Sequence, residues 1–302
     1  MGENKIMQDF ASQLLRSILY VPASKEKVLK KAPNLGADAL ILDLEDSVAP
    51  KDKVRARILT RDTLLRIASN ELLRTVRINA LSTDLWSRDV TTVFPGQPDA
   101  IVVPKVDNVE SLQPLDALLE TLESSENAGF TCSIWAMIES PLGVINAYAI
   151  ASHPRVSGLV MGTSDLTAAL GATPGVDRSN IMVALQQTIL AAKAAAIPII
   201  DGVFVDLKNS EGFASQCREG SRLGFSGKTV IHPSQVQPAN QLFLPSDSEV
   251  DKARQIFTSW QEARNRGEEI CVVDGVLVER LHARRAAEIL KSVNEILGST
   301  DL

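Results

Sequence analysis

The 302-residue sequence is poor in aromatic residues and carries no excess of positive charge. Aromatic residues make up 4% of the chain, and the formal net charge at pH 7 is −6. Proteins that bind nucleic acids present a basic surface to the phosphates and often aromatic rings to the bases. A nucleic acid is therefore not an expected partner.

Cysteine is scarce, and long apolar runs are absent. Three cysteines, Cys132, Cys217 and Cys271, have neither the number for a disulfide framework nor the spacing of a metal or redox motif. No apolar run approaches the length of a membrane span, and residues 1–16 contain no signal-peptide core. The sequence thus predicts a protein without a membrane partner, and the cytoplasm is the expected location.

Short apolar runs are plentiful, and eight of them alternate with helical patterns. A run that is apolar on both faces is typical of a parallel strand covered by helices. Eight such repeats predict a (β/α)₈ TIM barrel of the α/β class. A doubly wound sheet is the competing fold, but no glycine-rich dinucleotide loop follows an early strand. The predicted strands are residues 17–21, 39–44, 75–78, 100–103, 133–138, 156–161, 197–205 and 228–231, and the helix between the fifth and sixth strands is predicted at 142–152.

The pattern changes after Pro245. Two amphipathic helices, one on each side of residues 270–281, replace the strand–helix alternation, and Asp274-Gly275 between them is typical of a tight turn. We therefore expect a barrel domain at residues 14–244 and a C-terminal helical extension at residues 245–302. The extension is predicted to act as a flap on the barrel or on a neighbouring subunit.

Charged residues gather where the predicted strands end. Glu139 and Asp165 follow two consecutive buried strands, and parallel strands place their C-terminal ends on one rim. Glu45, Asp46 and Arg77 follow or end earlier strands, so they are expected at the same mouth. Several carboxylates at one mouth repel one another unless a cation neutralises them. Two hard oxygen ligands with room for water are typical of a Mg²⁺ site.

Structural roles are the alternative for each of these residues. Asp165 precedes a predicted helix and could be its N-cap. Arg77 could be a structural ion-pair partner, and His232, before Pro233, is expected to be structural because no orienting partner is evident. The coincidence of several charged residues at one rim favours a site.

Seven sequence blocks together resemble the citrate lyase β-subunit family, also called the HpcH/HpaI aldolase family, and within it the acyl-CoA lyase branch. They occur in the family's order and extend the resemblance over about residues 16–300. The blocks are RSILYVPA (16–23), ILDLEDSV (41–48) followed by PKDK (50–53), VRIN (76–79), VVPKV (102–106), AMIESPLGV (136–144), GTSDL (162–166) and GKTVIHPSQV (227–236).

The resemblance implies a Mg²⁺-dependent TIM barrel that acts on a coenzyme A thioester and forms homo-oligomers, often trimers. Glu139 and Asp165 would be the metal ligands, with Glu45 and Asp46 behind them through water. Arg77 would face the thioester oxygen. The turn expected to bind the keto-acid carboxylate consists of Gly162, Thr163, Ser164 and Asp165.

A C-terminal block implies the acid that transfers a proton to or from the acetyl carbon. The family's block resembles DG-x-M-V-D, whereas this chain has DGVLVE at 274–279, so Glu279 stands at the position of the acid. A second departure is Ala23, where the family usually has glycine after Val-Pro. Glutamate is one methylene longer than aspartate, which changes the reach of the proton-transfer group.

Three functions follow from this reading. The first is a carbon–carbon lyase that cleaves a short 3-hydroxyacyl-CoA, such as citramalyl- or malyl-CoA, to acetyl-CoA and pyruvate or glyoxylate. The second is a citrate lyase β subunit that acts on an acyl-carrier thioester. The third is a non-catalytic barrel with an assembly or regulatory role. Arg77, Glu139 and Asp165 speak against the third, whereas Glu279 in place of aspartate is its best support. The first two differ in the thioester carrier, which the sequence does not decide, and the first is the leading hypothesis.

Overall fold

A computed structural model describes residues 13–67, 72–125, 130–173, 175 and 177–297. The chain divides into two compact units, Met1–Asn240 and Gln241–Leu302, a division that lies four residues before the predicted boundary at 244/245. Within the described residues, no helix is long and apolar enough to cross a membrane.

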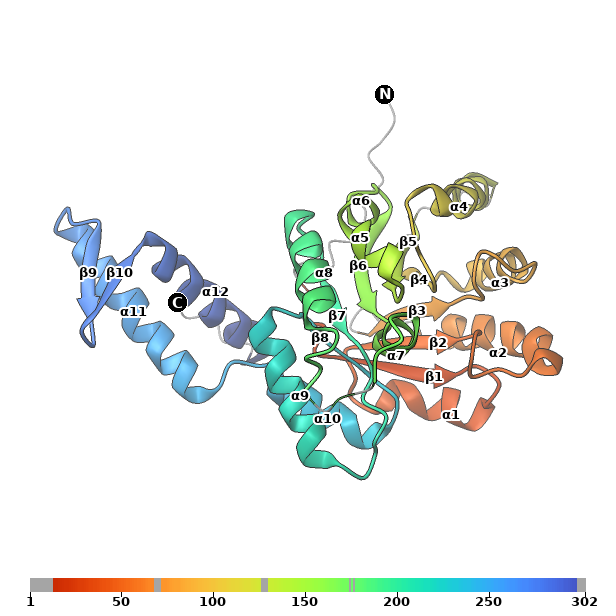
Figure 1. The fold of residues 1–302 in the computed structure, drawn as a ribbon, viewed down its shortest axis with the longest axis horizontal. Coiled ribbons are helices and arrows are strands. Elements are labelled where there is room, and N and C mark those ends of the chain that lie inside the picture. The colour runs from red at the N-terminus through yellow and green to blue at the C-terminus, as the bar shows by residue number, and fades with distance from the viewer. Residues whose placement is uncertain (1–12, 68–71, 126–129, 174, 176, 298–302) are drawn as a thin grey trace. The chain divides into compact units, whose positions relative to one another are not determined.

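The first unit is a closed barrel of eight parallel strands in the order β1 to β8 (Figure 1). Each strand pairs with the next along the chain, and β8 pairs with β1. The fold predicted from the sequence, a TIM barrel followed by a C-terminal helical part, is therefore confirmed. The strands are β1 Ser17–Pro22, β2 Ala39–Asp43, β3 Leu73–Arg77, β4 Ala100–Val103, β5 Ser133–Ile138, β6 Val156–Met161, β7 Ile199–Asp201 and β8 Gly227–Val230.

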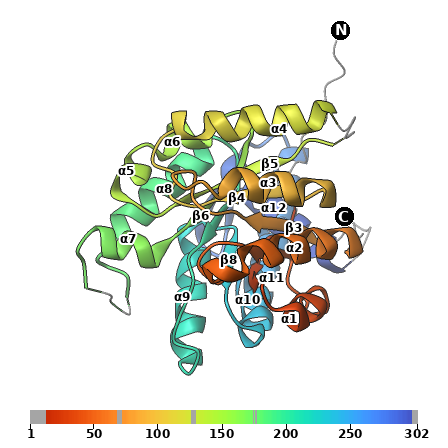
Figure 2. The ribbon, with the colours of Figure 1, turned by 90° about the vertical axis from the view of Figure 1, so that its right-hand side faces the viewer.

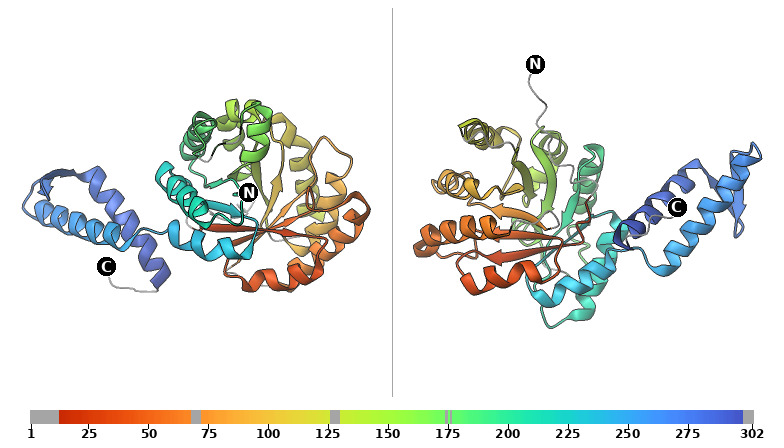
Figure 3. Two further views of the ribbon diagram at one scale, coloured as in Figure 1. Left: turned by 60° about the horizontal axis from the view of Figure 1, so that its bottom comes forward. Right: turned by 180° about the vertical axis from the view of Figure 1, so that it is seen from behind.

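Helices surround the barrel, as Figures 2 and 3 show. Their apolar sides cover strands that are buried along their whole length, such as β4, β5 and β6. The helices of this unit are α1 Glu26–Lys31, α2 Lys53–Arg66, α3 Trp86–Val93, α4 Gln113–Ser125, α5 Pro141–Ile145, α6 Ala147–Ala151, α7 Thr163–Ala169, α8 Met182–Ala194 and α9 Ser210–Leu223, followed by α10 Val236–Leu242 at the boundary.

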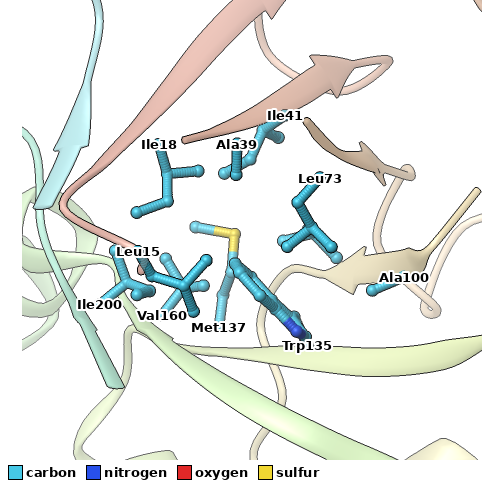
Figure 4. Packing of buried hydrophobic residues seen from close by; sticks show 11 residues of the cluster. Leu15, Ile18, Ala39, Ile41, Leu73, Ala100, Trp135, Met137, Val160 and Ile200 are labelled. Atoms are coloured by element: carbon cyan, nitrogen blue, oxygen red, sulfur yellow. The ribbon is translucent and has the colours of Figure 1, made fainter. Parts of the chain in front are cut away.

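The interior of the barrel is filled by side chains from alternate strand positions. Trp135 and Met137 of β5 meet Ile18 of β1, Ile41 of β2 and Ile200 of β7 at its centre (Figure 4). Because these side chains fill the interior of the barrel, a ligand can bind only at the rim formed by the C-terminal ends of the strands.

Two predicted elements differ from the observed ones. The strand predicted at 197–205 is limited to β7, because the chain turns away at Gly202 into a loop in which Val205 is exposed. The helix predicted at 142–152 is two short helices, α5 and α6, which are separated at Asn146. The Asn146 side chain donates a hydrogen bond to the Asp107 carbonyl oxygen at 2.8 Å, which fixes the break.

The second unit is a helical hairpin with a small antiparallel sheet. Helices α11 Asp247–Asn265 and α12 Arg280–Leu297 pack through Val250, Ala253, Ala286 and Leu290. Between them, β9 Ile270–Val273 and β10 Val276–Glu279 form the hairpin predicted from the Asp274-Gly275 turn. Ser246 and Glu249 cap α11 with reciprocal hydrogen bonds.

Candidate active site at the mouth of the barrel

A cavity of about 460 Å³ opens at the C-terminal ends of the barrel strands. One part of its wall is polar and the rest is apolar, so it can hold a ligand that carries both charged and apolar groups. Its polar and charged lining comprises Asp43, Asp46, Ser47, Arg77, Glu139, Thr163, Ser164 and Asp165. Its other lining residues are Tyr20, Pro22, Met137, Met161, Gly162, Val203 and Ile231.

Arg77 ends β3 and is held from one side by a carboxylate on the neighbouring strand. Asp43 is its register partner on β2, and it accepts hydrogen bonds from Arg77 Nε at 2.7 Å and Nη2 at 2.9 Å. Burial favours the neutral form of Asp43, but the hydrogen bonds and charge of Arg77 outweigh it and lower the Asp43 pKa. This bidentate pair fixes the plane of the guanidinium.

The remaining guanidinium nitrogen of Arg77 faces two further carboxylates. Arg77 Nη1 lies 3.0 Å from Glu45 Oε2 and 3.5 Å from Asp46 Oδ2. The Tyr20 ring lies on one face of the guanidinium, with its centroid 5.0 Å from Cζ. Arg77 is therefore both an ion-pair partner, as one prediction held, and a wall of the cavity.

Glu139 and Asp165, the two predicted metal ligands, line the same cavity. Glu139 follows β5, and its Oε1 accepts a hydrogen bond from the backbone N–H of Lys105 at 2.7 Å. Burial and the nearby charges of Asp165 and Glu45 raise the Glu139 pKa to about 8. The site thus concentrates negative charge that a bound cation would neutralise.

The turn at 162–165 depends on two close approaches. A Cβ atom on Gly162 would lie 2.3 Å from Glu139 Oε2, and one on Gly202 would lie 2.3 Å from Thr163 Oγ1. Only glycine leaves room at these two positions. Gly162 is also the N-cap of α7, and Asp165 lies within the first turn, so the N-cap alternative for Asp165 is wrong.

Glu45 lies between two cations, Arg77 and Lys105. Burial raises the pKa of Glu45, although Arg77 opposes the shift. Lys105 has a left-handed backbone (φ 56°) and places its Nζ 3.6 Å from Glu45 Oε1. This backbone turn also directs the Lys105 N–H at Glu139.

The structure brings most of the predicted residues to one cavity. Arg77, Glu139, Asp165 and Asp46 line it, as do Gly162, Thr163 and Ser164. Glu45 is not in the described lining but contacts Arg77.

Two further residues are not in the described lining of the cavity. His232 is exposed, and its Nδ1 accepts a hydrogen bond from the Ser234 N–H, a capping role. Glu279 ends β10 in the second unit, and its proton-transfer role stays a prediction.

Sequence reasoning missed Asp43 and Tyr20, which hold Arg77. Asp43 stands beside Glu45 and Asp46 in an acidic stretch, so composition alone did not single it out. The signal that could have found it is strand register, because the last residues of β2 and β3 are neighbours. Tyr20 carries no such signal in the sequence.

The donors present fit a magnesium ion. No group of three or more His, Cys, Asp or Glu side chains among the described residues is arranged to hold a metal. Two carboxylates with open space beside them suit Mg²⁺, which usually keeps several waters and uses one or two carboxylates. Thiolate- and imidazole-preferring metals would find no matching donors in the described lining of this cavity.

A closed (β/α)₈ barrel with an acidic, arginine-bearing mouth places the chain in the class of TIM-barrel proteins with a site at the strand C-termini. The sequence profile of HpcH/HpaI aldolase/citrate lyase matches residues 16–233. The chain belongs to this family.

The chain is also similar to individual proteins whose substrates or ligands are named. The chain is 40% identical over 281 residues to a (3S)-malyl-CoA thioesterase of Cereibacter sphaeroides, which covers 93% of this chain and 95% of that protein. It is 32% identical over 302 aligned residues to an L-malyl-CoA/beta-methylmalyl-CoA lyase of Cereibacter sphaeroides, with the same coverage. CitE of Mycobacterium tuberculosis, solved with magnesium, acetoacetate and coenzyme A, has a TM-score of 0.75 at 27% identity and covers 91% of this chain and 96% of its own.

Proposed function

We propose that the protein is a Mg²⁺-dependent enzyme that cleaves the carbon–carbon bond of a short 3-hydroxyacyl-CoA of the malyl-CoA or citramalyl-CoA class. The products would be acetyl-CoA and a 2-oxo acid, glyoxylate or pyruvate. The observation that carries the proposal is the presence of Arg77, Glu139 and Asp165 around one cavity. Relatives that act on malyl-CoA support the substrate class.

In this proposal Glu139 and Asp165 hold the metal, with Glu45 and Asp46 behind them. Bound Mg²⁺ would supply Lewis acidity at the substrate hydroxyl that becomes the new carbonyl. Magnesium in the CitE complex supports this choice of ion. In calorimetric titration Asp165→Ala should bind Mg²⁺ at least about tenfold more weakly, whereas the exposed Asp62→Ala on α2 should bind it normally.

Arg77 would stabilise the charge that develops during cleavage. The hydroxyl would pass its proton to a water molecule, the carbon–carbon bond would break as the hydroxyl oxygen becomes the carbonyl oxygen of the 2-oxo acid, and the electron pair would pass to the acetyl carbon and the thioester oxygen as an enolate. Arg77 lines the cavity, and its position is set before the ligand binds by Asp43 and Tyr20. Glu279 would then return a proton to the acetyl carbon.

The turn at 162–165 would bind the 2-oxo acid carboxylate through backbone N–H groups at the start of α7. We further propose that the chain works in the cytoplasm as a homotrimer or a multiple of it, with residues 14–244 as the catalytic domain and residues 245–302 as a flap. Light scattering of the purified protein gives the subunit count.

A second candidate is hydrolysis of the same thioester to a 3-hydroxy acid and free coenzyme A. The 40% identity to a (3S)-malyl-CoA thioesterase favours it. The same binding residues would serve. In hydrolysis, water attacks the thioester carbonyl carbon and the carbon–sulfur bond breaks to release coenzyme A, whereas in the lyase reaction the thioester stays intact and the carbon–carbon bond breaks.

Product analysis separates these functions. The purified protein is incubated with malyl-CoA, methylmalyl-CoA and citramalyl-CoA, with Mg²⁺ or with chelator, and the products are identified by mass spectrometry. Acetyl-CoA (propionyl-CoA from methylmalyl-CoA) together with an oxo acid supports the lyase, whereas free coenzyme A with the intact hydroxy acid supports the thioesterase. Turnover of a citryl-acyl-carrier thioester alone would support the citrate lyase subunit. No turnover of any substrate would leave the non-catalytic barrel.

A further inference from the structure

A buried lysine lies just behind the mouth of the barrel. Lys53 is the first residue of α2 and is 8% exposed. Its Nζ donates hydrogen bonds to the carbonyl oxygens of Leu44 at 2.6 Å and Glu45 at 2.7 Å, and to Asn79 Oδ1 at 2.7 Å. Three acceptors and no donor match the three N–H groups of an ammonium. Among the described residues, no carboxylate lies within ion-pair distance of it.

The acceptor on Asn79 has a fixed orientation. Its side-chain nitrogen and its backbone nitrogen both donate to Asp89 Oδ2, at 2.6 and 2.8 Å. The amide oxygen must therefore be the atom that faces Lys53. Asp89 is fully buried and is itself held by Arg57 Nε at 2.6 Å. Lys53 thus rests on a rigid polar frame.

The segment that Lys53 holds carries a contact to Arg77. Asp43 accepts the backbone N–H groups of Glu45 and Ser47 at 2.9 and 3.1 Å. Lys53 holds the carbonyl groups of the same turn. The turn is therefore fixed on both its N–H and its C=O side, and the Glu45 carboxylate is left 3.0 Å from Arg77 Nη1.

We propose that Lys53 is a positioning residue for Arg77 that acts through Glu45. Lys53 is outside the described lining of the cavity, so it does not touch the ligand. Burial lowers the pKa of Lys53, and nearby carboxylates oppose that shift. Its three hydrogen bonds all go to acceptors of the protein, so the nitrogen is engaged in holding the turn. The test of this proposal by enzyme activity rests on the proposed function, whereas its test by crystal structure does not.

A double-mutant cycle tests the route of action. Lys53→Met should lower kcat about tenfold or more, with little change in KM, because Arg77 loses a fixed partner. In a Glu45→Gln background the same change should cost less than about twofold, because the contact it supports is already weakened. Equal losses in both backgrounds would overturn the proposal.

The matched control is Arg155→Met. The Arg155 side chain is 10% exposed and precedes β6, at the end of the barrel opposite the mouth. It donates a hydrogen bond to the Cys132 carbonyl oxygen and pairs with Asp116 and Glu123 of α4. This variant should lose thermal stability but keep kcat within about twofold of the wild type. If it loses kcat as Lys53→Met does, general destabilisation explains the effect and the proposal is wrong.

A crystal structure of Lys53→Met tests the proposal even if the wild type turns over no thioester, an outcome that defeats the proposed function alone. The Glu45 carboxylate should have left Arg77 Nη1; a contact kept at 3.0 Å would overturn the proposal. If Lys53→Met does not fold, Asn79→Ala removes one acceptor and keeps the ammonium. Its structure should show the same displacement of Glu45, and an unchanged contact would again overturn it.

Discussion

At the scale of single residues, the site is built around a cation that is immobilised before any ligand arrives. Two nitrogens of Arg77 are committed to Asp43, and the third lies beside Glu45. A guanidinium held in this way needs no reorganisation when charge develops next to it, which is the condition under which a fixed charge lowers a reaction barrier most. The planar guanidinium, with its N–H groups pointing in several fixed directions, allows this arrangement.

Arg77→Lys should therefore lower kcat at least about a hundredfold, the scale for losing one oxyanion donor. Lysine keeps the charge but cannot hold Asp43 in a bidentate pair. Arg74→Lys on the same strand is the control, because Arg74 pairs with Asp99 away from the cavity lining. Steady-state kinetics of both variants measures the effect. Near-normal turnover of Arg77→Lys would show that Arg77 is only structural.

Glu139 predicts a pH dependence of metal binding. Its folded pKa of about 8 lies above the unfolded value of about 4.3, so the folded state holds the proton more tightly. Its contribution to stability is present below about pH 4.3 and is lost as the pH rises through about 8. Mg²⁺ replaces that proton, so the rise in Tm on adding Mg²⁺ should be larger at about pH 9 than at about pH 6.

Thermal unfolding with and without Mg²⁺ measures this difference. Glu139→Gln cannot ionise and is the control, so its smaller Mg²⁺ effect should not vary with pH over the same range. An equal shift of the wild type at both pH values would show that Glu139 does not bind the metal.

The sequence identified the charged residues at the strand ends, but it did not identify the residues that hold them in position. Arg77, Glu139 and Asp165 were recognisable because charge is unusual at the end of an apolar run. Asp43 was missed because its pairing depends on register between β2 and β3, and register is a property of the folded barrel. Lys53 was missed as a site residue because its hydrogen bonds reach back to residues 44 and 45.

At the scale of elements, the turn from β6 into α7 decides where Asp165 lies. Gly162→Ala would place a Cβ atom 2.4 Å from the Cβ of Glu139, so either the turn or Glu139 must move. We expect Mg²⁺ affinity to fall at least about tenfold in calorimetry. Gly171→Ala at the other end of α7 is the control, since its positive φ costs stability but no atom lies within 4 Å of the added Cβ. Equal affinities would show that the turn tolerates the added methyl group.

Element types were predictable from local periodicity, and element lengths were not. The run at 197–205 is apolar apart from Asp201 and Gly202, yet β7 ends at Asp201 because Gly202 packs against Thr163. Beyond β7 the chain contributes to the mouth of the barrel, where Val203 lines the cavity. An apolar run therefore indicates burial or a binding surface, and only the tertiary contacts distinguish the two.

At the scale of the whole molecule, the barrel was predictable because eight repeats leave few alternatives. The C-terminal unit was harder to predict from the sequence. Its two helices bury a small core against each other, but its hairpin leaves Ile270, Val272, Val276 and Leu277 exposed. Exposed apolar side chains that gather on one small element mark a surface that binds another protein. A neighbouring copy of this chain is the partner we expect, as the family resemblance implies.

Complementation tests whether Glu279 serves the site of a neighbouring copy. Glu279→Gln should lower turnover while leaving Mg²⁺ and oxo-acid binding nearly unchanged, since neither involves that side chain in the proposed mechanism. Glu279→Asp should keep or raise activity, because it restores the residue usual in the family. Each of Glu279→Gln and Asp165→Ala is expected to be nearly inactive alone.

Mixing the two inactive variants then separates shared sites from sites built by one chain. If the acid comes from a neighbour, some mixed oligomers pair an intact barrel mouth with an intact Glu279, and activity returns after the subunits exchange. If one chain supplies both residues, every site keeps one defect, and the mixture stays inactive at any ratio. Turnover measured across mixing ratios should then peak at an intermediate ratio for shared sites. A flat, inactive profile from chains that light scattering shows to have exchanged would rule sharing out.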